Sequence, residues 1–277
     1  MSRGKRRSKE RLDVLVAERE LAESRAQAQR LIRAGLVRVA GQVSDKPGTQ
    51  VAVDAEVTLK ARPRFVGRGG EKLAAALVRF GLDVTDVVAA DVGASTGGFT
   101  DCLLQHGARR VYAIDVGYGQ LAWRLRNDPR VVVMERTNAR YVEILPEPVG
   151  LVTADVSFIS LGLILPVVVG WFAPPLTPPR RGGDGQVVVL IKPQFEAGRR
   201  EVGKGGVVRD PEVHRRVLAR VLGVAAQLGL GLRGLMPSPL LGPAGNVEFL
   251  GWWELGAEGL DAESAIMACM AELGVEG

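Results

Sequence analysis

The stretch Asp-Val-Gly-Ala-Ser-Thr-Gly-Gly-Phe, residues 91–99, decides the fold of this chain. An apolar run over residues 87–90 leads into it, and Leu103 and Leu104 follow it among polar neighbours. This order predicts a strand, a glycine-rich turn and a helix. In an open parallel sheet, such a turn presents backbone groups to a ligand at the carboxyl end of a strand. The spacing Gly-x-x-x-Gly-Gly lacks the phosphate-binding pattern of dinucleotide folds, so a ligand without a pyrophosphate is favoured.

An acidic residue further along supports a nucleoside ligand. Residues 110–114 form a second short apolar strand that ends in Asp115. An acid about 20 positions beyond the glycine turn, at the tip of the next strand, is placed to bind ribose hydroxyls. The turn alone fits an ordinary strand–helix connection equally well. With Asp115 added, a nucleoside-type cofactor is the better interpretation, and S-adenosylmethionine is the obvious candidate.

Composition limits the class of protein. A chain of 277 residues, 47% hydrophobic, can form one large domain and a small one. It has no run of 18 apolar residues, and its positive start is not followed by an apolar segment, so neither a membrane span nor a signal peptide is expected. Cys102 and Cys269 lie far apart without metal-ligand spacing. We therefore expect a reduced cytoplasmic protein, monomeric and without a metal.

Charge is unevenly distributed along the chain. Residues 1–72 hold 17 of the 36 Lys and Arg against 9 of the 31 Asp and Glu, a balance of +8. The remaining residues therefore hold 19 against 22, a balance of −3. A basic appendage on a near-neutral body is typical of a surface that contacts a phosphate backbone. For residues 1–10 alone, a solubilising tail is the preferred interpretation.

The first 60 residues predict two helices and a few short strands. Leu12, Leu15 and Val16 repeat at helical spacing, and Ser24 caps a second helix that ends at Gly35. Strands are expected over residues 36–39, 42–43 and 51–59. These segments resemble the S4-like RNA-binding domain, which binds structured RNA through its second helix and the following hairpin. The resemblance, together with the cations of the following linker, predicts RNA contacts at Arg25, Arg30, Arg33, Lys46, Arg64 and Arg68.

The rest of the chain alternates strands and helices. Strands are predicted over residues 131–134, 151–154, 187–191, 230–236 and 248–253, and helices over residues 71–77, 121–123 and 161–169 and from Pro211 onward. A Pro- and Gly-rich surface loop is expected over residues 173–185. His106 and His214 are expected on the surfaces of helices.

Two strands are followed by charged residues. Asp155 follows the strand 151–154, and Lys192 follows the strand 187–191. Because the carboxyl ends of parallel strands face the same crevice, Asp155 and Lys192 are expected to converge near the cofactor. A structural ion pair and a functional pair both remain open on spacing alone.

Further segments carry a second resemblance. Residues 69–73, 91–101, 154–160, 191–196, 202–211 and 246–249 resemble the bacterial TlyA family of ribosomal-RNA methyltransferases, often labelled hemolysins. Their catalytic domain is similar to the FtsJ-type ribose 2′-O-methyltransferases. The resemblance covers nearly the whole chain in order. It implies an α/β fold, Rossmann-like, with a central, mostly parallel seven-stranded sheet, after a small α+β S4-like domain. The expected divisions are residues 1–60, a linker over 61–70, and a methyltransferase domain over 71–277.

The resemblance also implies a reaction and its residues. It implies transfer of a methyl group from S-adenosylmethionine to ribose 2′-hydroxyls of ribosomal RNA, at cytidines. The family's catalytic tetrad corresponds to Lys72, Asp155, Lys192 and Glu248, with Lys192 as base or proton acceptor. The expected cofactor contacts are Asp91, Gly93, Ser95, Thr96, Gly97, Gly98, Phe99, Asp115 and Asp155. In one departure from the family, the linker has Arg-Phe-Val at residues 64–66 where some members have a tryptophan.

Two rival hypotheses remain. The first is a non-catalytic RNA-binding assembly factor with a vestigial methyltransferase body, against which stands the presence of all four tetrad residues. The second is the lytic role that the hemolysin label suggests, against which stands the lack of a spanning segment.

Overall fold

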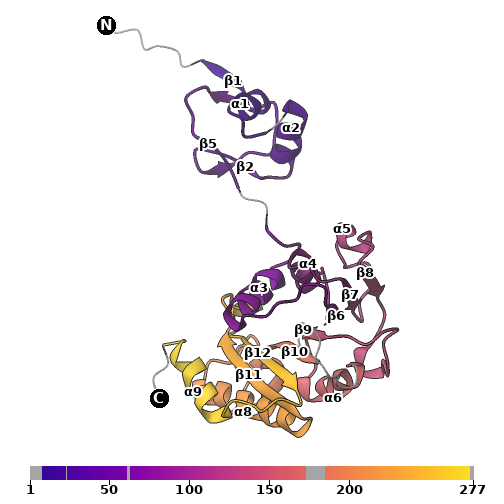
Figure 1. The fold of residues 1–277 in the computed structure, drawn as a ribbon. Coiled ribbons are helices and arrows are strands. Elements are labelled where there is room, and N and C mark those ends of the chain that lie inside the picture. Colours follow the sequence, from indigo (N-terminus) through magenta and orange to yellow (C-terminus); the bar gives the residue numbers. More distant parts are fainter. Residues whose placement is uncertain (1–7, 23, 61–62, 173–184, 275–277) are drawn as a thin grey trace. The chain divides into compact units, whose positions relative to one another are not determined.

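The structure, a computed structural model, describes residues 8–22, 24–60, 63–172 and 185–274 (Figure 1). The chain divides into two compact units, Met1–Pro63 and Arg64–Gly277. Residues 173–184 of the expected Pro- and Gly-rich loop, and residues 1–7 of the basic tail, lie outside the described residues. Because the second unit begins at Arg64, residues 64–70 of the expected linker pack with the larger unit.

The first unit is a small α+β domain, as expected. Its elements are β1 (Lys9–Arg11), α1 (Leu12–Glu18), α2 (Arg25–Arg33), β2 (Val37–Val39), β3 (Gln42–Val43), β4 (Gln50–Ala52) and β5 (Val57–Leu59). The hydroxyl of Ser24 caps α2 by accepting the amide of Gln27. Strands β3, β2 and β5 form one sheet, while β1, which the sequence did not reveal, pairs antiparallel with β4. Leu12, Leu15 and Ile32 lie in a core of their own.

The second unit contains a seven-stranded sheet in the order β11-β12-β10-β9-β6-β7-β8. Its strands are β6 (Val88–Val92), β7 (Arg110–Ile114), β8 (Val131–Met134), β9 (Leu151–Ala154), β10 (Gln186–Ile191), β11 (Leu230–Pro237) and β12 (Phe249–Leu255). Strand β12 is antiparallel to both of its neighbours, and the pairings from β10 to β8 are parallel. The mostly parallel, seven-stranded sheet is therefore confirmed.

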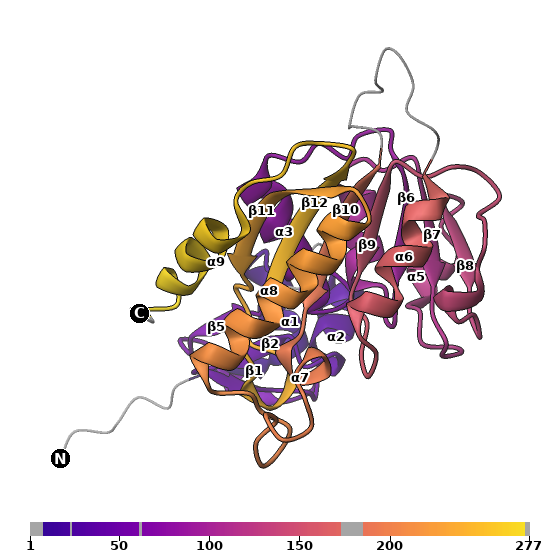
Figure 2. The ribbon, with the colours of Figure 1, turned by 90° about the horizontal axis from the view of Figure 1, so that it is seen from below.

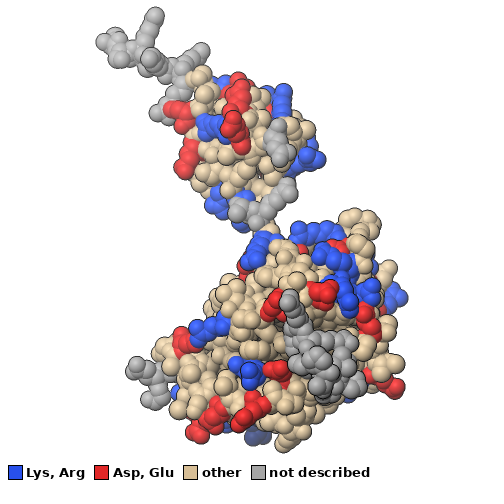
Figure 3. All heavy atoms as spheres, viewed as in Figure 1, with Lys and Arg blue, Asp and Glu red and all other residues tan. Residues whose placement is uncertain are grey.

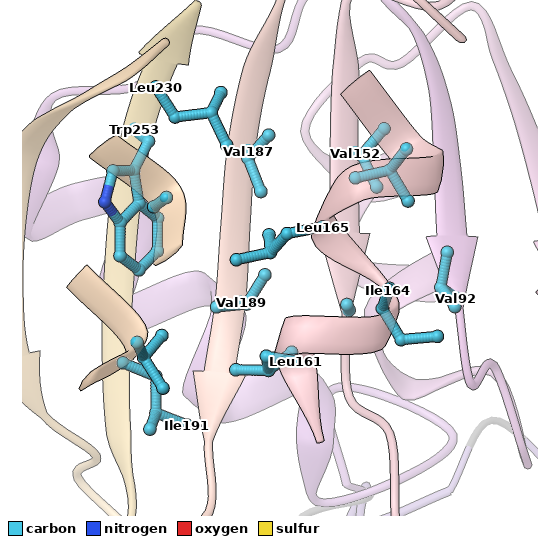
Figure 4. Packing of buried hydrophobic residues seen from close by; sticks show 14 of the residues in the cluster. Val92, Val152, Leu161, Ile164, Leu165, Val187, Val189, Ile191, Leu230 and Trp253 are labelled. Atoms are coloured by element: carbon cyan, nitrogen blue, oxygen red, sulfur yellow. The ribbon is translucent and has the colours of Figure 1, made fainter. Parts of the chain in front are cut away.

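Helices cover both faces of this sheet. They are α3 (Gly69–Phe80), α4 (Gly98–Gln105), α5 (Trp123–Arg126), α6 (Leu165–Val168), α7 (Pro193–Glu196), α8 (Pro211–Gln227) and α9 (Ala262–Ala271), with short 3₁₀ turns η1 (Ala139–Tyr141), η2 (Leu161–Leu163), η3 (Val169–Trp171) and η4 (Pro243–Gly245). Figure 2 shows α6 and α8 crossing one face and α3 lying behind the sheet. Each face has its own apolar core. On the α6 and α8 face, Trp253, Val189 and Leu165 are among the buried side chains (Figure 4).

Two expectations about helices were wrong, and one helix was missed. The single helix expected over residues 161–169 is three short pieces, η2, α6 and η3. Pro166 lies in the first turn of α6, where its missing N–H is tolerated; further inside a helix it would break a hydrogen bond. Helix α9 was not anticipated, although Asp261 caps it by accepting the amide of Ser264. His214, expected on the surface, is 4% exposed: its Nε2 lies 3.1 Å from the carbonyl oxygen of Val208, and its ring packs against Phe249.

The strand order creates one special position. From β6 the chain proceeds to β7 and β8 on one side, and then returns to place β9 on the other side of β6. In such doubly wound sheets, ligands bind where the strand order reverses, outside the carboxyl ends of the strands. Here those ends carry Gly93 after β6 and Asp155 after β9.

Candidate active site

A cavity of about 430 Å³ lies at this reversal point. Its volume falls within the range of small-molecule sites. It is lined by the ends of β6, β7 and β9 and by the segments that follow β7, β8 and β9, as follows: Val92, Gly93, Ser95, Ile114, Asp115, Val116, Gln120, Thr137, Asn138, Ala139, Asp155, Val156, Ser157, Phe158, Ile159 and Ile164. The cavity therefore mixes apolar walls with a few polar groups that could orient a ligand.

Gly93 brings two strand ends unusually close together. Its φ is +80°, and a Cβ at this position would lie 2.7 Å from the carbonyl oxygen of Asp155. Both the backbone conformation and the space therefore require glycine. Its backbone can approach a ligand in the cavity without an intervening side chain.

Asp115 is held by the backbone of the glycine turn. Its Oδ2 accepts the amide of Ser95 at 2.8 Å, and its Oδ1 accepts the amide of Gly117 at 2.7 Å. An ionised carboxylate offers about four acceptor positions, so two bonds leave capacity for hydroxyl donors of a ligand. Asp115 thus both shapes the turn and presents acceptor atoms to the cavity.

Asp91 has a different environment from that of a cofactor contact. It is fully buried in β6, where its Oδ2 accepts the amide and hydroxyl of Thr100 and its Oδ1 accepts the hydroxyl of Thr153. Burial raises the pKa of the Asp91 carboxyl to about 7. This side chain does not line the cavity. Its bonds fix the first turn of α4 to β6 and β9.

Four other residues of the glycine turn also lie outside the cavity lining. Phe99 is buried in the core on the α3 and α4 face. Gly97 leaves space for Leu121 and Leu125, and Gly98 for the backbone of Gly70. Thr96 is exposed. These residues determine the path of the turn, whereas Gly93 and Ser95 border the cavity.

Lys192 and Asp155 form an ion pair at the cavity's edge. The Nζ of Lys192 lies 2.6 Å from Asp155 Oδ1 and donates to the hydroxyl of Ser157 at 3.0 Å. The side chain of Lys192 is 10% exposed and that of Asp155 is 25% exposed. The lysine is thus held by two groups of the segment after β9 and keeps limited access to solvent.

Lys72 and Glu248 form a second ion pair, which is buried. The Nζ of Lys72 donates to Glu248 Oε2, and the two side chains are 8% and 0% exposed. Lys72 comes from the first turns of α3, and Glu248 immediately precedes β12. A charge pair so far from water is stable only while both partners are present.

Sheet register brings the two ion pairs to the same end of the strands. Ile191 of β10 pairs with Phe249 of β12, so Lys192 and Glu248 flank the same end of these strands. Strand β9 runs parallel to β10, so Asp155 follows β9 at that end too. All four residues of the expected tetrad therefore lie at one end of the strands of the sheet, as two ion pairs.

Sequence reasoning missed several residues at this site. Ser157 accepts from Lys192, and Gln120 and Asn138 line the cavity. Asn138 follows β8, so the rule that found Asp115 and Asp155 at strand ends could have found it too. Phe158 has a positive φ of +62° and a side chain that is 90% exposed, which the sequence alone does not signal.

The expected RNA-contact residues are exposed in both units. On the face shown in Figure 3, Lys and Arg side chains are interspersed with Asp and Glu. In the first unit, Arg30, Arg33 and Lys46 carry no side-chain hydrogen bond or ion pair to the described residues. Arg25 differs, because its Nε donates to the buried carboxylate of Asp13 at 3.0 Å. The bonds that Asp13 accepts hold its pKa below the ordinary value.

Arg64 and Arg68 belong to the second unit. The guanidinium of Arg64 lies 4.7 Å from the ring centre of Phe65, and Arg68 donates to the carbonyl of Leu241 at 2.9 Å. Both side chains still reach solvent.

Neither a metal cluster nor a membrane-spanning helix is found among the described residues. Within residues 8–22, 24–60, 63–172 and 185–274, no three His, Cys, Asp or Glu side chains gather in a way that could hold a metal ion. In the same part of the chain, no helix has the length and apolarity needed to cross a membrane.

Comparison with known proteins identifies both units. Residues 65–254 match the family model of FtsJ-like methyltransferases, and residues 10–57 match that of the S4 domain. The chain is 50% identical over 272 residues to YqxC of Bacillus subtilis (strain 168), provisionally named an rRNA methyltransferase, covering 95% of this chain and 94% of that one.

Two further relatives cover nearly the full length. The chain is 46% identical over 274 residues to the 16S/23S rRNA (cytidine-2′-O)-methyltransferase TlyA of Mycobacterium tuberculosis (strain ATCC 25618 / H37Rv), covering 95% of this chain and 97% of that one. A solved structure from Streptococcus thermophilus, provisionally named a hemolysin, is similar with a TM-score of 0.71 and 43% identity, covering 97% of this chain and 96% of that one.

Proposed function

Because this chain belongs to the TlyA/hemolysin A family of rRNA 2′-O-methyltransferases, we propose that it methylates ribose 2′-hydroxyls of cytidines in ribosomal RNA, with S-adenosylmethionine as the methyl donor. The choice of cytidine follows the name of the Mycobacterium tuberculosis relative. The observation that carries the proposal is the Lys192–Asp155 pair at the rim of a cavity where the strand order reverses.

The cavity has the features that this cofactor requires. The bare backbone of Gly93 admits the amino-acid part of the cofactor, and the acceptor oxygens of Asp115 suit ribose hydroxyls. Apolar residues of the lining, such as Ile114 and Ile164, suit the flat base. When bound, S-adenosylmethionine supplies an activated methyl group. We assign direct contacts to Gly93, Ser95, Asp115 and Asp155, and a supporting role to Asp91, Thr96, Gly97, Gly98 and Phe99.

Lys192 is the proposed proton acceptor. Its Nζ is oriented by Asp155 and Ser157, so one remaining direction of the amine can meet a ribose hydroxyl. In its neutral form the amine would polarise this hydroxyl or accept its proton, while the oxygen takes the methyl group and the bond from the methyl group to the donor's sulfur breaks. Positioning of the hydroxyl supplies much of the acceleration, because the donor is already reactive.

The second pair completes the tetrad in this proposal. Glu248 orients Lys72, and Lys72 holds the ribose-phosphate part of the RNA. The N-terminal S4 domain supplies the main RNA contacts through Arg25, Arg30, Arg33 and Lys46, and Arg64 and Arg68 extend them. The proposed division remains residues 1–60, 61–70 and 71–277, with residues 64–70 packed on the catalytic unit.

Mass-spectrometric mapping of 2′-O-methyl groups tests the proposal. Ribosomal RNA lacking these modifications would be incubated with the full chain and S-adenosylmethionine, and then digested. New 2′-O-methylcytidine is the expected result, and its absence from both subunit RNAs would overturn the proposal. Calorimetric titration with S-adenosylmethionine distinguishes the enzyme from the rival assembly factor, since a vestigial site would not bind the cofactor. Leakage from lipid vesicles exposed to the pure protein would support the lytic alternative.

A further inference from the structure

The segment after β9 forms one wall of the cavity. Residues 155–159 all line it, and the segment then turns into η2 (Leu161–Leu163). Its first half is held by Lys192, which contacts Asp155 and Ser157. Phe158 within it adopts a positive φ, a conformation that costs energy for a residue with a side chain. A wall of this kind needs a second anchor to keep one shape.

Helix α7 provides that anchor. It begins directly after Lys192, and its last residue, Glu196, is buried. The Oε2 of Glu196 accepts the hydroxyl of Ser160 at 2.6 Å, and its Oε1 accepts the amide of Leu161 at 2.7 Å. Between the two anchors, the rings of Phe195 and Phe158 lie 4.8 Å apart. The cavity wall is therefore connected to α7 at its beginning, middle and end.

We propose that Glu196 is a positioning residue for methyl transfer, which fixes the segment 155–161 so that the cavity wall and the partners of Lys192 keep their geometry. This inference rests on the proposed function. Glu196 lies four residues after Lys192, at the other end of the short helix α7. This helix therefore fixes both the position of Lys192 and the wall that Lys192 contacts.

The hydrogen bonds of the Glu196 carboxylate are directed at the cavity wall. A buried carboxylate is costly unless hydrogen bonds compensate it, and burial raises the pKa of Glu196. Its two carboxylate oxygens accept from Ser160 and Leu161, one each. Its backbone carbonyl separately accepts Arg220 of α8, which secures α7 to the body of the unit. The carboxylate can therefore be changed while α7 keeps this attachment.

The test compares Glu196→Ala with Glu196→Gln in the full chain. Glutamine keeps an acceptor for the amide of Leu161, whereas alanine keeps none. Glu201→Ala is the matched control, because Glu201 lies on the adjacent loop and accepts a backbone amide and an arginine, but does not contact the wall. Each variant is assayed for the Kd of S-adenosylmethionine by calorimetry, for kcat on ribosomal RNA, and for Tm.

We expect Glu196→Ala to raise the Kd of S-adenosylmethionine and to lower kcat, each by about tenfold or more, at temperatures where the variant is folded. Glu196→Gln should restore most of both, and Glu201→Ala should resemble the wild type. A lower Tm with Kd and kcat unchanged would reduce Glu196 to a purely structural residue and overturn the proposal.

Ser160→Ala keeps the test decisive if Glu196→Ala does not fold. This variant removes one partner of Glu196 and should give a smaller change of the same sign in Kd and kcat. Unchanged Kd and kcat in Ser160→Ala would then overturn the proposal. Failure of the proposed function itself is distinguishable, because the wild type would then produce no 2′-O-methyl groups.

Discussion

The Cα of Gly93 lies so close to Asp155 that a Cβ on residue 93 would come within 2.7 Å of the carbonyl oxygen of Asp155. This contact joins β6 and β9 at the point where the strand order reverses, and both residues line the cavity. Asp155 also holds Lys192. Binding of a cofactor at Gly93 and the position of the lysine are therefore linked through one short stretch of backbone.

Gly93→Ala should weaken S-adenosylmethionine binding. The added methyl group collides with backbone that cannot move aside without displacing Asp155, and the φ of +80° is unfavourable for alanine. We expect a loss of at least about tenfold in affinity by calorimetry, and a lower Tm. Gly119→Ala is the control, because Gly119 has a similar φ of +71° but open space around its Cβ position. Equal losses in the two variants would show that backbone strain, not the contact with Asp155, is responsible.

Lys192→Ala should abolish methyl transfer, and its effect on the affinity for S-adenosylmethionine should be much smaller than its effect on kcat. The amine is the proposed proton acceptor, and Lys192 does not line the cavity. A fall in kcat of about a hundredfold or more is expected, measured as methyl transfer to ribosomal RNA under single-turnover conditions. Unchanged turnover would remove Lys192 from the mechanism.

The buried pair predicts different effects of single and double changes. Glu248→Ala leaves the charge of Lys72 buried without its partner, which should lower the free energy of unfolding by about 3–5 kcal/mol. The double variant Lys72→Met/Glu248→Leu replaces the pair by apolar groups and should recover most of that stability. Activity should be lost in both variants. Full activity in the stable double variant would mean that the pair serves only the fold.

The raised pKa of Asp91 leads to a prediction of how the free energy of unfolding varies with pH. Its pKa is about 7 in the folded protein and near its ordinary value, about 4, in the unfolded chain. As pH rises, the unfolded chain therefore loses this proton at a lower pH than the folded protein does. The stability that the protonated form contributes is complete below about pH 4 and is lost as pH rises through about 7.

Asp91→Asn cannot ionise, so its free energy of unfolding should fall less between pH 4 and pH 8 than that of the wild type. The difference should be at most about 1.4 kcal/mol per pH unit. Urea unfolding followed by tryptophan fluorescence measures it in the second unit alone, because all four tryptophans lie after residue 64. Parallel pH curves for the two proteins would contradict the raised pKa.

The strands were largely predictable, because each is a continuous apolar run with clear ends. Strands β7, β8 and β9 begin and end at the predicted residues. Strand β1 was not predictable, since three polar residues become a strand only by pairing with β4, some 40 positions later. Helix α9 was missed because its apolar residues do not form one clear stripe.

The residues of the candidate site also divide into those that the sequence could predict and those that it could not. Asp115, Asp155 and Lys192 follow parallel strands, so one rule places them together. Glu248 precedes an antiparallel strand, and only the family resemblance indicated it. Phe99 shows the limit of motif reasoning, because the helix that starts at Gly98 directs its ring into the core. Contacts such as Glu196 with Ser160 depend on the folded positions of α7 and of the segment after β9, which no local pattern reveals.

The arginines of α2 in the first unit are expected to have different roles. Arg30 and Arg33 are exposed on α2 without side-chain hydrogen-bond or ion-pair partners among the described residues, so they are available for phosphates. Arg30→Ala/Arg33→Ala should weaken binding to ribosomal RNA and reduce its dependence on salt, by roughly 0.7–0.9 in slope for each phosphate that the protein no longer binds. The affinity for S-adenosylmethionine should not change. Filter binding over a range of salt concentrations measures the slope.

Two controls separate RNA binding from stability and from net charge. Arg215→Ala/Arg216→Ala removes two charges from α8 and should leave the salt slope unchanged. Arg25→Ala, unlike Arg30→Ala/Arg33→Ala, should also lower the stability of the first unit, because Asp13 is buried and its carboxylate accepts from Arg25, Arg11 and Gln29. If both double variants reduced the slope equally, the effect would come from net charge, and α2 would not be the RNA-binding surface.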